Sequence, residues 1–236
     1  MQAPAARSRS RVADGLTPIT VTAIIDAAVS LTVRCGVENW SLRELSRMLD
    51  VGPRVIYHHI GDRDAVIAEV VQRVVAELPV PPRDLPWREW FAAMLLGSRP
   101  VLRRHRGVAR RLVVMGPAVP AALDLMDQGI QVLHSAGFGR GAIAAYRFLI
   151  NTTFMQIAAE DDRVERHPTA RDELAVLLLG QRDAVNRPGL AMVGADIAAH
   201  GSAPTDTALV DARFYEYTVS RALDGVAATL VSVADR

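Results

Sequence analysis

The chain has 236 residues, with 27 basic and 26 acidic side chains, so its net charge of +1 makes any contact with nucleic acid depend on local clustering. Hydrophobic residues make up 50% of the chain, and the abundance of alanine and leucine favours helices. Alternating Val/Ile/Thr runs joined by Asn-Gly or Asp-Gly turns are missing, which argues against a sheet. No apolar run is long enough to cross a membrane. Cys35 is the only cysteine, which fits a reducing cytoplasm.

The N-terminal segment 1–17 has no apolar signal core, and its composition predicts a disordered basic tail. It contains three arginines, Arg7, Arg9 and Arg11. Contact of these side chains with a DNA minor groove or with phosphates is one interpretation, and a solvated tail is an equal alternative. The first helix is predicted over 20–34, where apolar residues recur at helical spacing, and Gly36 is a suitable stop.

Residues 41–63, SLRELSRMLDVGPRVIYHHIGDR, contain the most informative pattern in the chain. Ser41 and Glu44 stand in the spacing of a capping box, which predicts a helix over 41–49. A corner at 50–52 follows, and Pro53 opens a second short helix over 53–59, because proline at the first helical position loses no hydrogen bond. Two short helices around a tight corner are typical of a helix-turn-helix, whose second helix lies in the DNA major groove.

A fourth helix is predicted over 63–78, with Asp62 as its N-cap and one continuous apolar stripe along it. Four prolines between 79 and 86 then interrupt the chain. We therefore place a domain boundary there, with a DNA-binding domain over 18–78 and a ligand-binding and dimerisation domain over 79–236.

The second domain shows longer apolar helical segments. Helices are predicted over 87–104, 107–115, 120–136, 141–159, 173–186 and 207–233, whereas the Gly- and Pro-containing residues 188–206 are predicted to form a loop. The expected fold is all-α: an N-terminal three-helix head with a helix-turn-helix, a linking fourth helix and a larger C-terminal helical bundle. The last helix and the 141–159 helix are the expected dimer interface, although an internal bundle would also use such broad apolar stripes.

Two further patterns lie in this domain. The basic cluster at 99–111 is interpreted as a solvated face, or as the partner of the acidic residues 160–162, in preference to a nucleic-acid site. Polar residues interrupt the apolar segment 146–158, and buried polar groups need partners, so this segment is the best source of a ligand pocket. The candidate ligand-binding residues, each of which is also compatible with ordinary core packing, are Trp90, Met94, Met126, His134, Phe148, Asn151, Thr152, Met155 and Gln156.

The order of these elements resembles the TetR family of bacterial transcriptional repressors. The strongest similarity is VIYHHIGDRDAVIAEV at 55–70, with its Tyr-x-His and the basic residue that opens the fourth helix. The segments WREWFAAMLLGSRPVLRRHRGVARRL and ALDLMDQGIQVLHSAGF are similar to the C-terminal domain of the tetracycline-repressor branch. The resemblance implies a homodimer that binds a near-palindromic double-stranded DNA operator and is released when a small molecule binds the C-terminal domain.

The helix-turn-helix pattern, together with the resemblance for Arg43, Tyr57 and His59, indicates which residues contact DNA; at the position of Arg54 the family often has a smaller residue, so the operator sequence cannot be carried over. Arg43 reaches a base edge or a phosphate, unless it is merely solvated, and Arg54 lies where an arginine can fork onto guanine. Tyr57 and His59 donate to phosphate oxygens, with a half-buried Tyr57 as the alternative, and Arg63 reaches a phosphate at the start of its helix. The other candidates for DNA contact are Ser41, Pro53, Val55 and His58.

Other classes of protein remain open. An all-α enzyme is one alternative, but the sequence contains no nucleophile elbow, phosphate loop or zinc-protease motif. An interaction module without DNA readout is the other. We expect no cofactor and no metal site, because adjacent histidines such as His58 and His59 point apart on a helix. The expected location is the cytoplasm.

Overall fold

The computed structural model describes residues 19–116, 118–181, 185–200 and 204–234, and these residues form helices without strands. The predicted all-α fold is confirmed. The chain divides into two compact units, Met1–Val70 and Val71–Arg236. The predicted tail at 1–17, with its three arginines, lies outside the described residues. Within the described part, no helix is both long and apolar enough to span a bilayer.

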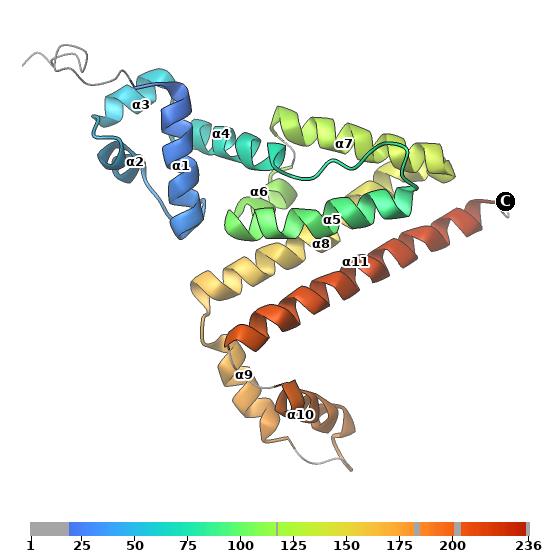
Figure 1. Ribbon diagram of the computed structural model, residues 1–236. Coiled ribbons are helices and arrows are strands. Elements are labelled where there is room, and N and C mark those ends of the chain that lie inside the picture. Colours follow the sequence, from blue (N-terminus) through green and yellow to red (C-terminus); the bar gives the residue numbers. More distant parts are fainter. Residues whose placement is uncertain (1–18, 117, 182–184, 201–203, 235–236) are drawn as a thin grey trace, which may run out of the picture. The chain divides into compact units, whose positions relative to one another are not determined.

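The first unit begins with α1, Val21–Cys35 (Figure 1). The Thr20 hydroxyl accepts a hydrogen bond from the backbone of Ala23 and so caps the first turn. Gly36 ends the helix at φ 86°, a conformation that glycine adopts without steric cost. The buried face of α1 carries Ile24, Ala28 and Leu31.

The predicted two-helix motif consists of α2, Leu42–Met48, and α3, Pro53–His59. The capping box is present in full, because the Ser41 hydroxyl accepts from the Glu44 backbone and the Glu44 carboxylate accepts from the Ser41 backbone. In the corner, Asp50 has φ 51°, which aspartate tolerates better than most residues. The backbone N–H of Val51 then donates to the Ser46 carbonyl and closes the turn.

Helix α4 spans Arg63–Ala76. Asp62 precedes it as the predicted N-cap, because its carboxylate accepts a hydrogen bond from the Ala65 backbone. The core of the head joins all four helices and the segment between α1 and α2. Its buried apolar side chains are Ile24, Leu31, Trp40, Leu45, Ile56, Val66, Ile67 and Val70. The indole N–H of Trp40 donates to the buried hydroxyl of Thr32, so the polar edge of this core residue is satisfied.

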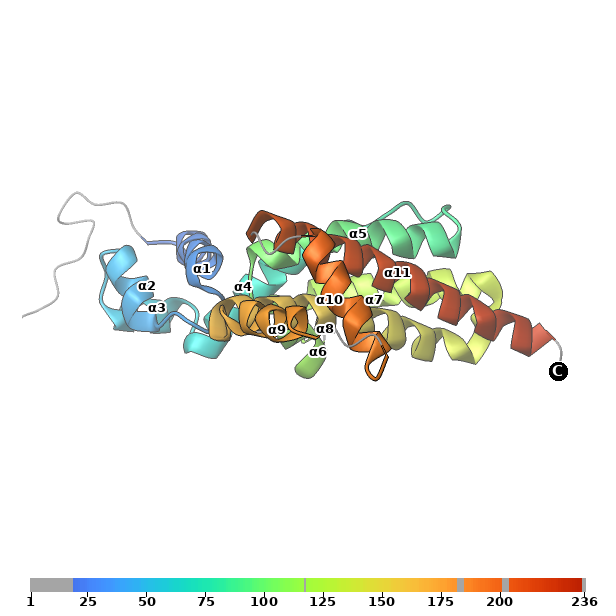
Figure 2. The ribbon, with the colours of Figure 1, turned by 90° about the horizontal axis from the view of Figure 1, so that it is seen from below.

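The second unit is a helical bundle. It contains the end of α4 and then α5, Trp87–Arg104; α6, Val108–Val114; α7, Pro120–Leu133; and α8, Ala142–Arg166. After α7 the chain makes one wider turn over His134–Phe138, where Gly137 at φ 98° ends the helical path as predicted. Helix α8 is the central element, since α5, α6, α7 and α11, Pro204–Ala234, all pack against it. α8 and α11 run side by side (Figures 1 and 2).

The prediction of a loop over 188–206 is wrong. Residues Pro188–His200 form α10, which packs on α9, Ala170–Leu179 (Figure 2). Pro188 takes the first helical position, where proline is tolerated. Gly194 lies where a Cβ atom would be only 2.8 Å from the Leu178 carbonyl oxygen. This glycine therefore allows two helices to approach closely, and it does not interrupt a helix.

The arginine cluster of α5 and α6 pairs with acidic residues of α8. This confirms the interpretation of the basic cluster at 99–111 as a partner of the acidic residues 160–162. Arg99 donates to Glu160 at 2.8 Å, Arg106 to Glu165 at 2.9 Å and Arg110 to Asp162 at 2.8 Å. Two of the carboxylates, Glu160 and Asp161, are buried. Arg103 pairs with both of them. The cluster therefore joins α5 and α6 to α8 and is largely neutralised.

Candidate DNA-binding head and ligand pocket

Helix α3 buries one side chain and exposes most of the others. Ile56 is fully buried and fixes the helix on the head, while Val55 is half-buried. Tyr57 is 65% exposed, so it is not half-buried as the alternative prediction had it. The remaining exposed candidates on this helix are Pro53, Arg54, His58 and His59. α3 thus presents a hydrogen-bonding surface of a cation, a phenol and two imidazoles.

Two candidates lie on or next to α2. Arg43 is exposed in its first turn. Ser41 is exposed too, but its hydroxyl also donates to the Glu44 carboxylate at 2.9 Å. The structure therefore gives Ser41 a structural function as a helix cap, whether or not it also contacts DNA.

Arg63 is held by the head itself. Its guanidinium donates to the carbonyl oxygens of Trp40, Val37 and Glu38 at 2.9–3.1 Å. The group also lies 5.3 Å from the centre of the Trp40 ring, within the range of a cation–π contact. Arg63 therefore ties the start of α4 to the segment between α1 and α2. Sequence reasoning missed this function, because the three acceptors are backbone atoms and leave no side-chain signal.

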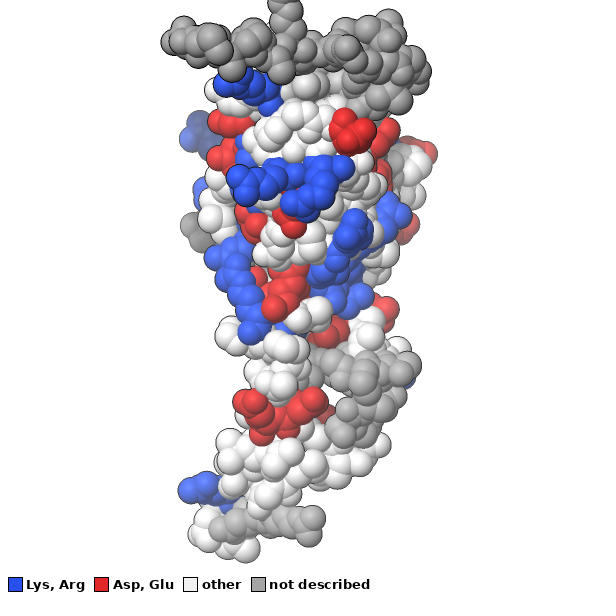
Figure 3. Space-filling model, turned by 90° about the vertical axis from the view of Figure 1, so that its left-hand side faces the viewer, with Lys and Arg blue, Asp and Glu red and all other residues white. Residues whose placement is uncertain are grey.

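The charge on this side of the protein is not one continuous basic surface. Figure 3, seen from the side on which Figure 1 places α2 and α3, shows arginine side chains in separate patches with carboxylates between them. This pattern agrees with the net charge of +1. Binding of a polyanion by this protein must then depend on a few placed side chains rather than on a general positive field.

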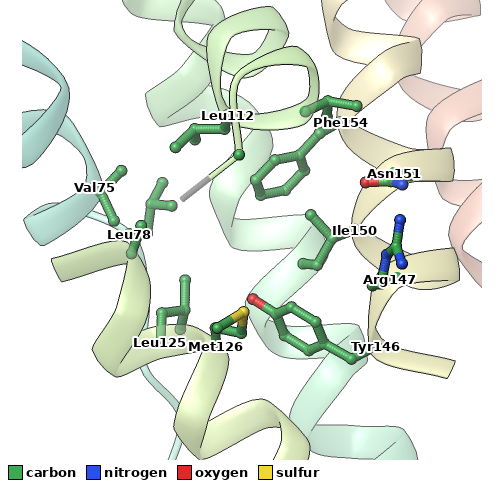
Figure 4. A pocket seen from close by; sticks show the side chains of 13 residues that line it. Val75, Leu78, Leu112, Leu125, Met126, Tyr146, Arg147, Ile150, Asn151 and Phe154 are labelled. Atoms are coloured by element: carbon green, nitrogen blue, oxygen red, sulfur yellow. The ribbon is translucent and has the colours of Figure 1, made fainter. Parts of the chain in front are cut away.

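The second unit contains a cavity of about 300 Å³ (Figure 4), a volume at the lower end of the range for small-molecule sites. Its walls come from the end of α4, from α6, α7 and α8, and from the turns beside them. The lining residues are mostly apolar and comprise Val75, Leu78, Leu112, Val113, Gly116, Ala122, Leu125, Met126, Tyr146, Arg147, Ile150, Asn151 and Phe154. A second hollow of about 440 Å³ lies between the segment 83–87 and α7, and none of the predicted contact residues lines it.

Of the nine predicted ligand-binding residues, Met126 and Asn151 line the first cavity. Trp90 and Met94 lie in the core, where the Trp90 indole donates to the Pro81 carbonyl at 3.0 Å. The other five lie outside the lining: His134, Phe148 and Met155 are exposed, and Thr152 and Gln156 are half-exposed.

Four lining residues of α8 that sequence reasoning did not select are Tyr146, Arg147, Ile150 and Phe154. The available signal was the four-residue spacing of 146, 150 and 154, which places one row of side chains on one face of a helix.

The arrangement defines a class of protein. A small all-α head with an exposed second helix after a tight corner, followed by a helical bundle with an apolar cavity, is the architecture of transcriptional regulators with a separate ligand-binding domain. The family model described as tetracyclin repressor-like, C-terminal domain, matches residues 78–230. The chain belongs to this TetR family of transcriptional regulators.

Individual relatives agree. An HTH-type transcriptional regulator of Saccharopolyspora erythraea is 31% identical over 151 residues, which cover 63% of this chain and 63% of that protein. The class A tetracycline repressor from transposon 1721 of Escherichia coli is 26% identical over 183 residues, covering 74% and 84% of the two chains. The fold is similar to that of the Streptomyces coelicolor TetR family protein ActR in complex with actinorhodin, with a TM-score of 0.72, 23% identity and coverage of 91% and 98%.

Proposed function

We propose that this protein is a homodimeric, DNA-binding repressor that a small molecule releases from a near-palindromic operator. It acts in the cytoplasm of a bacterium, where its operator is, and it binds its effector without turning it over. Among its relatives, one is named as a tetracycline repressor and another is seen in complex with actinorhodin, which supports a small organic effector here.

The observation that carries the proposal is the continuity of α4. Its first residue, Arg63, is bonded to the head, and Val75 near its end lines the cavity, together with Leu78 just beyond. Gln72 of the same helix accepts a hydrogen bond from the backbone of Ala121 at 2.9 Å, at the start of α7. A ligand that moves the cavity wall therefore acts on the same continuous helix whose first turn belongs to the head.

The proposal is tested by gel retardation, which measures binding of the protein to the DNA beside its own gene. Binding should weaken steeply with salt, because each neutralised phosphate contributes about −0.9 to the log–log slope. Arg54→Ala should reduce the preference for the operator over unrelated DNA and relax it at one base position, since a bidentate contact to guanine contributes roughly 1–3 kcal/mol of discrimination. Arg43→Ala, if it removes a phosphate contact, should weaken all DNA alike.

The outcomes are separable. If neither variant changes binding to the operator, α3 is not the reading helix and the docking proposal is wrong. If the parent protein does not retard any DNA fragment from beside its own gene, the result favours the alternative of an interaction module without DNA readout. Turnover of a substrate by the purified chain would favour the enzyme alternative instead.

A further inference from the structure

The polar groups of the cavity are few and come from one helix. Its lining includes three polar side chains, Tyr146, Arg147 and Asn151, all on α8, and the rest of the lining is apolar apart from glycine backbone. Arg147 and Asn151 are one helical turn apart and form a row beside that of Tyr146, Ile150 and Phe154. A bound molecule would therefore meet its polar contacts along one edge and apolar walls elsewhere.

Tyr146 is a fixed hydrogen-bond donor inside this cavity. Its side chain is only 8% exposed, and its hydroxyl points toward the α7 side of the cavity, near Met126, without a hydrogen bond to any described residue (Figure 4). Burial raises the pKa of this phenol, so it stays protonated at neutral pH. Gly129 of α7 leaves room for the ring, because a Cβ atom there would lie 2.7 Å from it.

Arg147 adds a cation without a counterion. Within the described part of the chain its guanidinium has neither an ion pair nor a hydrogen bond, in contrast to the arginines of α5 and α6. The cavity lining contains no carboxylate. Asn151, one turn further along α8, supplies an amide beside it (Figure 4).

We propose that the cavity binds a lipophilic organic acid. The carbon skeleton lies against the apolar walls, an anionic group pairs with Arg147 at the open edge, and an oxygen deeper in the ligand accepts from the Tyr146 hydroxyl. This inference rests on the proposed function, because it names the chemical class of the effector. A purely hydrocarbon ligand would leave the buried Tyr146 hydroxyl without an acceptor, and a cationic ligand would place like charge beside the exposed Arg147.

A pair of fluorescent probes tests the charge requirement directly. 1-Anilinonaphthalene-8-sulfonate and N-phenyl-1-naphthylamine share one aromatic skeleton, but only the first carries an anionic group. The full-length parent should bind the sulfonate more tightly than the neutral amine. Arg147→Gln should raise the Kd of the sulfonate about threefold to tenfold, as expected for a partly solvated charge-assisted contact, and change that of the amine less than twofold.

The matched control is Arg140→Gln. Arg140 is exposed just before α8 and is not part of the cavity lining, so this variant should bind both probes as the parent does. Ala122→Leu, which adds bulk to the cavity wall, should weaken both probes and thereby show that the signal comes from the cavity.

Two results would overturn the inference. One is a pair of Kd values in Arg147→Gln that both equal those of the parent, and the other is an equal loss of affinity for both probes, which would mean that Arg147 acts through packing alone. DNA retardation by the parent and by Arg140→Gln is recorded separately. Failure of the probe experiment with intact DNA binding rejects the ligand class only, whereas absence of DNA binding rejects the proposed function.

Discussion

Arg54 and Arg63 stand near the starts of two successive helices, yet their surroundings differ. Arg54 is exposed on α3, and its position leaves it available for a base edge. Arg63 is bonded to three carbonyl groups of its own head. The sequence pattern predicts contact with DNA for both, because it reflects residue type and position, whereas in the folded head the guanidinium of Arg63 already has acceptors.

Replacing Arg63 should therefore destabilise the head. Arg63→Ala leaves part-buried carbonyl groups without donors and removes the contact with the Trp40 ring, so we expect a loss of about 2–4 kcal/mol in the free energy of unfolding of the head. Urea unfolding followed by the fluorescence of Trp40 measures it, in a background where Trp87 and Trp90 are replaced by phenylalanine. Arg47→Ala, on the exposed side of α2, is the control. Equal free energies of unfolding of the two variants would show that Arg63 does not stabilise the head and acts only at the surface.

Asp161 provides a pH-dependent prediction. Burial raises the pKa of this carboxyl from 3.8 to about 6, although the Gly107 N–H and Arg103 oppose the shift. Between these two values the folded chain binds a proton that the unfolded chain has released. The free energy of unfolding therefore falls as pH rises from about 4 to about 6, by about 3 kcal/mol at most, and this contribution then levels off.

Asp161→Asn removes the titrating group and keeps its size. The stability of this variant, measured by chemical denaturation at several pH values, should fall less than that of the parent over the same interval. Glu160, whose pKa burial also raises, remains in both proteins and accounts for a residual slope. Parallel curves for parent and variant would show that Asp161 stays ionised in the folded state throughout.

At the scale of elements, the head was predictable because its signals are local. The capping box, the Pro53 start and the Asp62 cap each act within four residues, and the observed α3 has the predicted bounds. The α10 helix was not predictable in this way. Its glycines were interpreted as loop residues, but Gly194 is required by a contact with α9, which is tertiary information.

The two glycines of α10 offer a matched pair of substitutions. Gly194→Ala places a methyl group against the Leu178 carbonyl, which belongs to the backbone and cannot rotate away, so α9 and α10 must separate. Gly189→Ala meets nothing within 4 Å among the described atoms and should stabilise the helix by up to about 1 kcal/mol. Hydrogen exchange over 170–200 should be faster in Gly194→Ala and unchanged or slower in Gly189→Ala. The same exchange in both variants would contradict this close packing.

The cavity shows the same limit of sequence reasoning. Asn151 was selected as a polar residue that interrupts an apolar helix and Met126 as a residue of the cavity wall, and both line the cavity. Phe148 and Met155 were also selected as wall residues, but they are exposed on α8 and lie outside the lining. When a helix is apolar on several faces, its sequence does not show which face lines the cavity and which is exposed to solvent. That depends on where α6, α7 and α11 pack against it.

At the scale of the whole molecule, the outer faces of α8 and α11 lack a partner within the described chain. Phe148 and Met155 of α8 are exposed, as are the stacked rings of Phe214 and Tyr217 on α11. Soluble domains seldom leave several such large side chains of adjacent helices uncovered. A second copy of the chain, paired through these two helices about a twofold axis, would cover these side chains, as expected for the dimer interface predicted from the sequence.

Two substitutions on α8 separate this interface from a general effect of surface charge. Phe148 is 50% exposed and Val164 is 56% exposed, but Val164 follows Phe148 by 16 positions, which places the two on nearly opposite faces of the helix. Phe148→Asp buries a charge between the two copies and should give a monomer in sedimentation analysis. Its affinity for the palindromic operator should fall at least tenfold, because the two heads no longer bind as a linked pair. Val164→Asp should remain dimeric with parental affinity. A dimeric Phe148→Asp variant would move the interface to another surface.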